Sequence, residues 1–128
     1  MKKLTVRTRT RTEFIDITRD VQQAVTDAGI HDGRVCVFVP HTTAGVTINE
    51  HADPDVARDL GMVLERLVPW DDSGYRHGEG NSAAHVKASL MGSSAQVPVE
   101  NGRLCLGTWQ GVFFCEFDGP RTRTVWVC

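Results

Sequence analysis

The strongest constraint on the fold is a β-hairpin signal in the last third of the chain. Asn101 and Gly102 lie between two apolar runs, "AQVPV" and "RLCLGTW". An Asn-Gly pair favours the type I′ turn that joins adjacent antiparallel strands. Two further runs, "GVFFCEF" and "RTVWVC", follow and are separated by the turn sequence "DGPR". The sequence therefore predicts a sheet that is mostly antiparallel.

The first two thirds of the chain add helices and more strands. Strands are predicted over residues 3–10, 13–17, 34–40 and 45–49, and helices over 18–29, 53–67 and 82–91. This order is typical of α+β proteins and not of a doubly wound parallel sheet. A length of 128 residues suits one domain. We predict a single compact α+β domain over residues 1–128, with sandwich-like antiparallel sheet and two to three helices.

Helix boundaries carry their own signals. Thr18 is the predicted N-cap of the first helix, which Gly29 ends. Asp53 is the predicted N-cap of the second helix, with Pro54 in its first turn. The third helix is predicted to end at Gly92.

Composition and charge exclude several classes of protein. Net charge is −2, and although residues 1–11 hold five basic and no acidic residues, no nucleic-acid-binding motif accompanies them. The alternating pattern there favours a solvated strand face. No apolar run approaches the length of a membrane span, and no signal peptide is recognisable. Four cysteines without a CxxC pair favour a reducing cytosol without structural disulfides. Cys36, Cys105 and Cys115 lie in apolar runs, so we predict that they are small core residues.

Polar side chains gather where the strand over 34–40 ends and where the next one, over 45–49, ends. The first group is His41, Thr42 and Thr43, and the second group is Asn49, Glu50 and Asp53. Loops held by a rigid scaffold are the usual place for binding residues. If the two strands form a hairpin, the two groups fall at opposite ends of it. A site that spans a subunit interface would still bring them together.

A second polar set follows in the loop over residues 69–82 and the helix after it. It contains Tyr75, His77, Glu79, Asn81, His85, Ser93 and Ser94. Loops of this length in a compact domain are usually functional or disordered. Free amide groups at the start of a helix can hold an anion, so we predict an anion-binding role here.

Three histidines and two acidic residues are candidate metal ligands: His41, His77 and His85, with Glu50 or Glu79. Their spacing matches no standard metal signature, and a hydrogen-bonded structural role is the alternative for each. His31 and His51 are predicted to be loop or surface residues without a role. Glu116 lies on a very apolar strand, so we expect a salt bridge to Arg103, Arg121 or Arg123.

Three segments together are similar to one known family. The segments are "PHTTAGVTINEHADPDV", "YRHGEGNSAAHVKASLMGSS" and "VPVENGRLCLGTWQGVFFCEFDGPR". They resemble the YjbQ family of secondary thiamine-phosphate synthases over roughly residues 3–127. The resemblance implies a compact α+β fold, a homotrimer, and sites near subunit boundaries.

The resemblance also implies a transferase reaction. The nitrogen of a thiazole phosphate attacks the methylene of an aminopyrimidine pyrophosphate, and pyrophosphate leaves. On this interpretation His41, Glu50 and His85 are catalytic, and a divalent metal, Mg²⁺ or Zn²⁺, is possible. His41, His77 and His85 would hold such a metal, with Glu50 or Asp53 if it is Mg²⁺. The predicted phosphate- and substrate-binding residues are Thr42, Thr43, Asn49, Asn81, Ser93, Ser94 and Trp109.

An alternative from a different class is a binding protein without turnover. A trimer that holds a metal or a small phosphorylated metabolite would use the same His, Glu and Ser side chains, because residue types alone do not reveal turnover. Whether the bound ligand is chemically changed distinguishes the two hypotheses.

Overall fold

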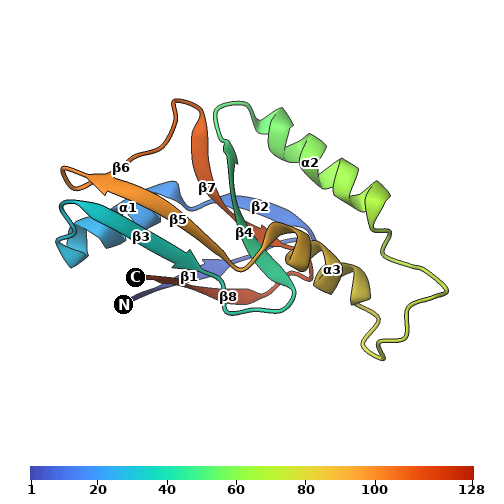
Figure 1. The fold of residues 1–128 in the computed structure, drawn as a ribbon. Helices are drawn as coiled ribbons and strands as arrows, with labels where there is room; N and C mark the ends of the chain where they lie inside the picture. Colours follow the sequence, from blue (N-terminus) through green and yellow to red (C-terminus); the bar gives the residue numbers. More distant parts are fainter.

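Eight strands form two antiparallel sheets in the computed structural model, which describes residues 1–128 (Figure 1). The larger sheet has the order β1-β8-β3-β5-β6 and the smaller one the order β2-β7-β4. The strands are β1 Lys2–Arg7, β2 Glu13–Asp16, β3 Gly33–Phe38, β4 Ala44–Glu50, β5 Ser94–Glu100, β6 Arg103–Leu104, β7 Gln110–Glu116 and β8 Thr122–Val127. All the pairings are antiparallel. The predicted α+β, sandwich-like class is confirmed.

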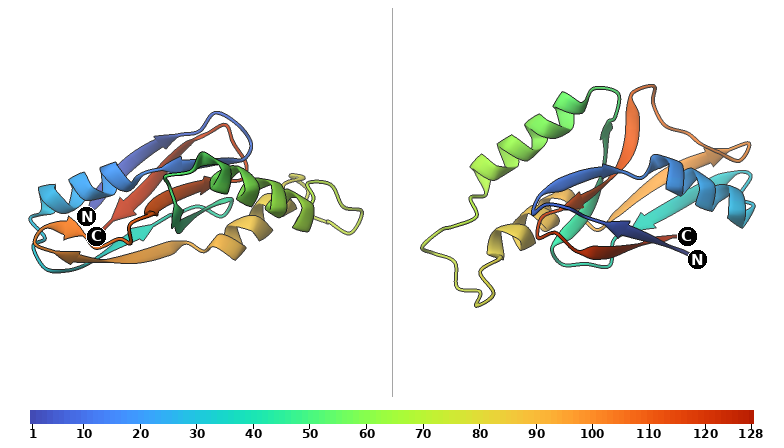
Figure 2. Two further views of the ribbon diagram at one scale, coloured as in Figure 1. Left: turned by 90° about the horizontal axis from the view of Figure 1, so that it is seen from above. Right: turned by 180° about the vertical axis from the view of Figure 1, so that it is seen from behind.

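The main core lies between the two sheets and extends to α1 (Thr18–Ala28). Alternate residues of β3, such as Val35 and Val37, point into it, as the period-2 geometry of a strand requires. From α1, Val21 and Val25 are fully buried against the same cluster. Figure 2 shows α1 lying alongside the sheets, away from the other two helices. α1 therefore completes one side of the sandwich.

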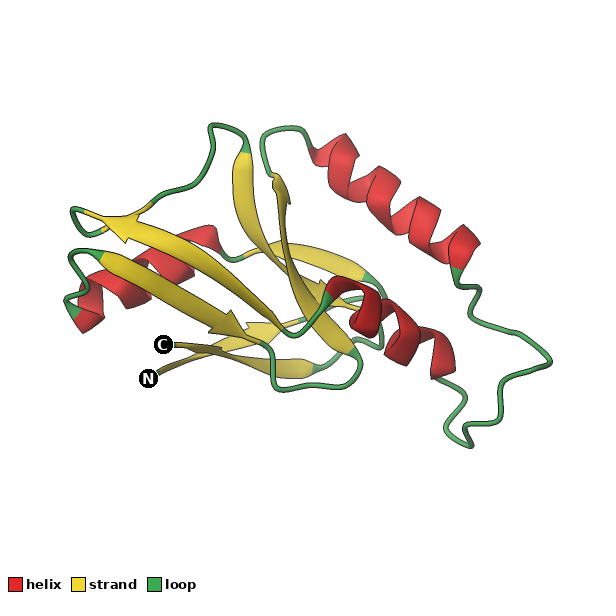
Figure 3. Cartoon of the chain, in the orientation of Figure 1, coloured by secondary structure: helices red, strands yellow, loops and turns green.

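Strand β7 is buried on both of its faces. Val112 and Phe114 belong to the main core, whereas Phe113 and Cys115 pack in a second cluster beneath α2 (Pro54–Leu67) and α3 (Ser82–Met91). A strand covered on both sides reads as a continuous apolar run, which explains "GVFFCEF". Figure 3 shows α2 and α3 together on the outer side of the three-stranded sheet.

Of the two predicted N-cap residues, one is confirmed and the other is wrong. Asp53 caps α2 as predicted, because its carboxylate accepts a hydrogen bond from the Asp55 amide at 2.9 Å. Thr18 is not the cap of α1: the N-cap is Ile17, which makes no side-chain cap hydrogen bond. The Thr18 hydroxyl instead donates to Asp16 and accepts from the Val112 amide at 2.8 Å. Thr18 therefore ties the start of α1 to β7.

The turn at residues 101 and 102 is confirmed, whereas the strand that follows it is shorter than predicted. Asn101 and Gly102 both have positive φ, at 51° and 75°, as a type I′ turn requires. The strand after this turn is much shorter than the predicted run over 103–109, because only Arg103 and Leu104 pair with β5. β3 and β4 do not form a hairpin. They belong to different sheets, so residues 39–43 cross from one layer to the other.

The cysteines differ in burial, although three of them lie in apolar runs. All four are free, and Cys115 is buried as expected. Cys36 is only partly buried and Cys105 is exposed, which corrects the prediction that both are core residues.

None of the three helices is both long enough and apolar enough to pass through a lipid bilayer.

Candidate functional site

Strand β4 carries polar residues at both ends, and the structure keeps the two groups apart. His41, Thr42 and Thr43 precede its first residue, whereas Asn49 and Glu50 are its last two. Seven residues of extended strand span on the order of 20 Å. One chain by itself therefore does not unite the predicted catalytic residues His41 and His85 with Glu50.

The first group lines a hollow of about 430 Å³, called here the His41 pocket. Its lining is Pro40, His41, Thr42, Thr43, His77, Glu79, Asn81, His85, Arg121 and Arg123. A smaller hollow of about 290 Å³ adjoins it, shares His41 and His85, and adds Ser89 and Ser93. His41 and His85 therefore stand between two connected spaces. Both volumes are close to the range of small-molecule sites.

His41 is held by the backbone of β8. Its Nε2 lies 3.0 Å from the amide nitrogen of Thr124 and 3.1 Å from the Thr124 carbonyl oxygen. The amide always carries its proton, so it donates to Nε2 and favours the tautomer in which Nδ1 carries the hydrogen. Burial, together with the nearby Arg123 charge, lowers the pKa of His41. The ring therefore presents a neutral Nδ1–H group, a hydrogen-bond donor.

A buried ion pair supports the floor of the His41 pocket. Arg123 donates to both carboxylate oxygens of Glu116, with its shortest contact at 2.7 Å from Nη2 to Oε2. The same Nη2 donates to the Thr43 hydroxyl at 2.8 Å, and the Thr8 hydroxyl donates to Glu116 at 2.9 Å. Glu116 has no exposed surface. The expected salt bridge of Glu116 is thus confirmed, with Arg123 as the partner.

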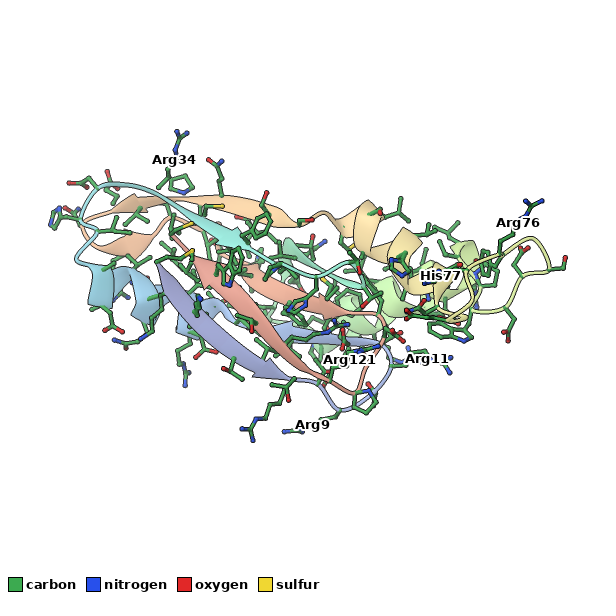
Figure 4. The ribbon with its side chains drawn as sticks, turned by 90° about the horizontal axis from the view of Figure 1, so that it is seen from below. Arg9, Arg11, Arg34, Arg76, His77 and Arg121 are labelled. Carbon is green, nitrogen blue, oxygen red and sulfur yellow. The ribbon has the colours of Figure 1, made fainter.

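Helix α3 supplies the opposite wall. The His77 and His85 rings meet edge to face with their centroids 5.1 Å apart. Figure 4 shows His77 turned toward the helix, whereas Arg76 beside it projects away from the molecule. Asn81, at the N-cap of α3, is buried and donates to Asp118 at 2.9 Å, but its Oδ1 has no partner. An unpaired buried acceptor is uncommon, and this one lies in the wall of the His41 pocket.

The remaining predicted site residues lie elsewhere. Ser94 begins β5 opposite Phe38 and lines neither hollow of the His41 pocket. The Glu50 carboxylate accepts a hydrogen bond from the Asp53 amide at 3.2 Å, and the Asp53 carboxylate caps α2. Both carboxylates therefore stabilise the turn that leads into α2. Trp109 is 61% exposed, and its carbonyl accepts from the His51 amide near the end of β4. Asn49, Glu50, Asp53 and Trp109 are therefore far from His41 in one chain.

The structure holds no group of three or more His, Cys, Asp or Glu side chains placed to share a metal ion. The predicted set of His41, His77 and His85 is consequently not assembled as metal ligands within one chain.

Two functional contacts are not predicted from the sequence. Arg121 reaches the His41 pocket, although nothing local in "DGPRTR" marks it as a pocket residue, and Glu79, already a candidate from the sequence, lines the same pocket. The sequence indicates that His51 is a loop or surface residue, which its exposure confirms, and assigns it no role; its Nδ1 lies 2.8 Å from an oxygen of Asp16. The two residues are 35 positions apart, so only the pairing of β2 and β4 with β7 reveals this contact.

The fold and the His41 pocket together define a class of small α+β protein. Two antiparallel sheets pack face to face, and a histidine-containing polar pocket lies where the chain enters one strand. The sequence profile of the family described as "UPF0047 protein YjbQ-like" matches residues 2–128. The chain therefore belongs to the UPF0047 YjbQ-like family.

Similar proteins occur in bacteria and archaea. The UPF0047 protein YugU of Bacillus subtilis is 54% identical over 99% of this chain and 96% of its own length. The UPF0047 protein MJ1081 of Methanocaldococcus jannaschii is 46% identical over 98% of this chain and 90% of its own. A crystal structure of a YjbQ/UPF0047 family protein from Clostridium acetobutylicum is 55% identical, covering 100% of this chain and 98% of that one, with a TM-score of 0.97. The conserved hypothetical protein TT1486 of Thermus thermophilus gives 0.93 at 48% identity, again over 100% and 98% of the two chains.

Proposed function

We propose that the protein is a small transferase that joins an aminopyrimidine pyrophosphate to a thiazole phosphate, as the resemblance to secondary thiamine-phosphate synthases implies. The observation that carries the proposal is the orientation of His41. Strand β8 holds its Nε2, so Nδ1–H is the ring donor left for a ligand, and His41 lines a pocket that also contains His85 and Arg121. Fixed donors of this kind stabilise charge that develops on phosphate oxygens.

The reaction forms a bond between the thiazole nitrogen and the pyrimidine methylene. The bond between that methylene and the pyrophosphate oxygen breaks, and its electron pair leaves with pyrophosphate. The step needs no redox partner. Negative charge builds on the leaving group, so the protein has to supply hydrogen-bond donors and positive charge there.

In this chain the donors come from three elements. His41 follows β3, His85 belongs to α3, and Arg121 precedes β8. Arg121 is itself held by the Asp118 carboxylate at 2.9 Å, which fixes the direction of its guanidinium group. Ser89 and Ser93 add hydroxyl groups in the adjoining hollow. The donors of the His41 pocket do not form a metal-ligand set, so we assign phosphate binding to these side chains. Participation of Mg²⁺ or Zn²⁺ remains a separate prediction.

The test is a coupling assay on purified protein with both substrates, in the presence of Mg²⁺ or of EDTA. His85→Ala should reduce thiamine phosphate formation at least tenfold without a change in the circular dichroism spectrum. His31→Ala is the matched control, because His31 is exposed and paired only with its neighbour Asp32. His41→Ala should behave as His85→Ala does. Normal turnover in both pocket variants would contradict the proposal.

Retention of a phosphorylated ligand without turnover would favour the alternative, a binding protein that uses the same pocket. Calorimetry with the thiazole phosphate alone separates the two outcomes. Binding that needs His85, together with no product from the complete substrate pair, would establish a binding protein.

We also propose that the protein is a homotrimer. The resemblance to the YjbQ family implies three subunits, and apolar side chains on α2 and α3 support self-association, because Leu67 is 69% exposed and Leu90 is 58% exposed. Met62, Val63 and Val86 are exposed on the same two helices. Apolar groups that gather on one side of a protein often mark a subunit interface. Light scattering during gel filtration measures the mass directly, and Leu67→Glu should lower it to that of one chain.

A further inference from the structure

A separate hollow of about 640 Å³ belongs to neither the His41 pocket nor the space beside it. It lies at the start of α1 and is called here the His51 hollow. Its lining is Asp16, Thr18, Arg19, Asp20, Gln22, His51, Arg103, Leu104 and Leu106. None of these residues has a role in the proposed transferase. The volume suits a small organic molecule.

An Asp–His pair forms one edge of this hollow. His51 Nδ1 lies 2.8 Å from Asp16 Oδ2, and both side chains are partly exposed. The other oxygen of Asp16 accepts from the Thr18 amide at 2.9 Å and from the Thr18 hydroxyl. Burial alone would raise the pKa of Asp16, but these hydrogen bonds and His51 together lower it. The carboxylate therefore stays ionised and orients the ring, which leaves Nε2 free to bind a ligand.

The backbone of β7 is shaped to receive this ring. Gly111 lies on β7 opposite Asn49 of β4. A Cβ atom at Gly111 would approach His51 Nδ1 to 2.4 Å and the ring carbon Cγ to 2.5 Å. No real Cβ atom tolerates such contacts, so the position of His51 depends on a missing side chain in the neighbouring strand.

Two arginines complete the wall. Arg19 comes from the first turn of α1 and Arg103 from β6. Neither guanidinium takes part in an ion pair of the chain. Gln22 fixes the distance between their two elements, because its amide donates to the Gly102 carbonyl at 2.9 Å and accepts from the Leu104 amide at 3.0 Å. Two guanidinium groups without an ion-pair partner, on elements that Gln22 holds together, can bind an oxyanion.

We propose that the His51 hollow is a second binding site, for a small organic molecule that carries an oxyanion and a modest apolar part. Arg19 and Arg103 bind the oxyanion, His51 Nε2 hydrogen-bonds to the ligand, and Leu104 and Leu106 contact its apolar part. Asp20 opposes the anion, since its carboxylate lines the same hollow. The proposal stands independently of the transferase, because the two sites share no residue.

The experiment is a nuclear magnetic resonance titration of histidine-labelled protein with sodium sulfate, whose charge is constant across neutral pH. The His51 ring signals, assigned from a His51→Asn variant, should shift saturably with sulfate but not with sodium chloride of equal ionic strength. The double variant Arg19→Met/Arg103→Met should weaken the effect at least tenfold. Asp20→Asn should strengthen binding several-fold. Acetate and phenyl phosphate, titrated separately, distinguish a carboxylate from a phosphate ligand and test the apolar wall.

The matched control is Arg7→Met/Arg34→Met, which removes two exposed arginines from β1 and β3. Figure 4 shows Arg34 projecting from the molecule at the end opposite His77. This control should titrate as the wild type does. Equal shifts with chloride, unchanged binding in the Arg19/Arg103 variant, or shifts confined to His41 and His85 would each overturn the proposal.

Discussion

The two ends of β4 place a histidine in two different electrostatic settings. Before the first residue of β4, His41 Nε2 accepts a hydrogen bond from the Thr124 amide of β8, and the ring lies close to the buried Arg123 charge. After the last residue of β4, His51 Nδ1 is hydrogen-bonded to the carboxylate of Asp16. The first ring is kept neutral as a donor, and the second ring is oriented by a carboxylate. The same residue type thus serves different chemistry because its partner differs.

The two settings also differ in what supports them. The His41 pocket rests on a fully buried ion pair with several hydrogen bonds, and charges in such a place need every partner. The pair of His51 and Asp16 is part-exposed and water can replace its contacts. We therefore expect the largest losses of stability from substitutions beneath His41, and smaller losses of stability, together with loss of ligand binding, from substitutions around His51.

The largest effect is expected from Arg123→Met. Loss of the guanidinium leaves Glu116 charged and buried without its partner, so the free energy of unfolding should fall by about 3–5 kcal/mol. Urea denaturation at pH 7 measures it, with Arg34→Met as a control that should change little. The double variant Glu116→Met/Arg123→Met should recover part of the loss. A double variant no more stable than the single one would contradict this account.

Gly111→Ala is expected to have the next largest effect. The added methyl group collides with the His51 ring, and overpacking of this kind destabilises proteins by about 1–3 kcal/mol. Because the ring has to leave Asp16, sulfate binding in the His51 hollow should be lost as well. Gly78→Ala is the control, since a Cβ atom there meets nothing within 4 Å. Wild-type sulfate binding in Gly111→Ala would show that the close packing of the His51 ring on Gly111 is not needed for the site.

Asp16→Ala should lower stability by about 1 kcal/mol at pH 7, the usual effect of removing a carboxylate that accepts from the start of a helix. The pKa of Asp16 is lowered in the folded protein, so its contribution is present above the unfolded value near 3.8. The contribution disappears as the pH falls through the lower, folded value. Denaturation of both proteins at pH 7 and at acid pH measures this, and the stability difference should shrink in acid. A difference that does not depend on pH would contradict the role of the charged carboxylate.

The smallest effect is the pH dependence contributed by His41. Its pKa is lowered by burial and by Arg123, so between the unfolded value near 6.5 and the lower folded value the unfolded chain binds more protons. Stability from this group is therefore present above about pH 6.5 and is lost as the pH falls below it. Urea midpoints between pH 7.5 and 5.5 should fall less in His41→Gln than in the wild type. Equal slopes would mean that the ring is not held neutral.

Local chemistry explains why several features of the fold are predictable. The caps Asp53 and Gly92 and the turn at Asn101 and Gly102 depend on contacts within a few residues, and the structure has all of them. The alternation along β7 likewise separates its two faces and marks Glu116 as a buried acid in need of a partner. In each case the deciding interaction is short-range or follows from strand geometry.

The candidate site is predictable only in part. His41, His85, Thr42, Thr43, Asn81 and Ser93 do line one pair of connected hollows. Glu50 and Trp109 do not join them, and Arg121 enters the pocket from a distant segment. Similarity to a known family identifies residues worth attention. It does not say which of them share a space within one chain.

The fold class, the helix limits near Asp53 and Gly92, and the hairpin at residues 100–103 are predictable from the amino-acid sequence, because those features follow from backbone preferences and periodicity. Three features become visible only in the folded chain: β3 and β4 belong to different sheets, Arg123 is the partner of Glu116, and His51 contacts Asp16. These pairings join residues far apart along the chain. They exist only because strand register brings the segments together, and no local pattern encodes that register.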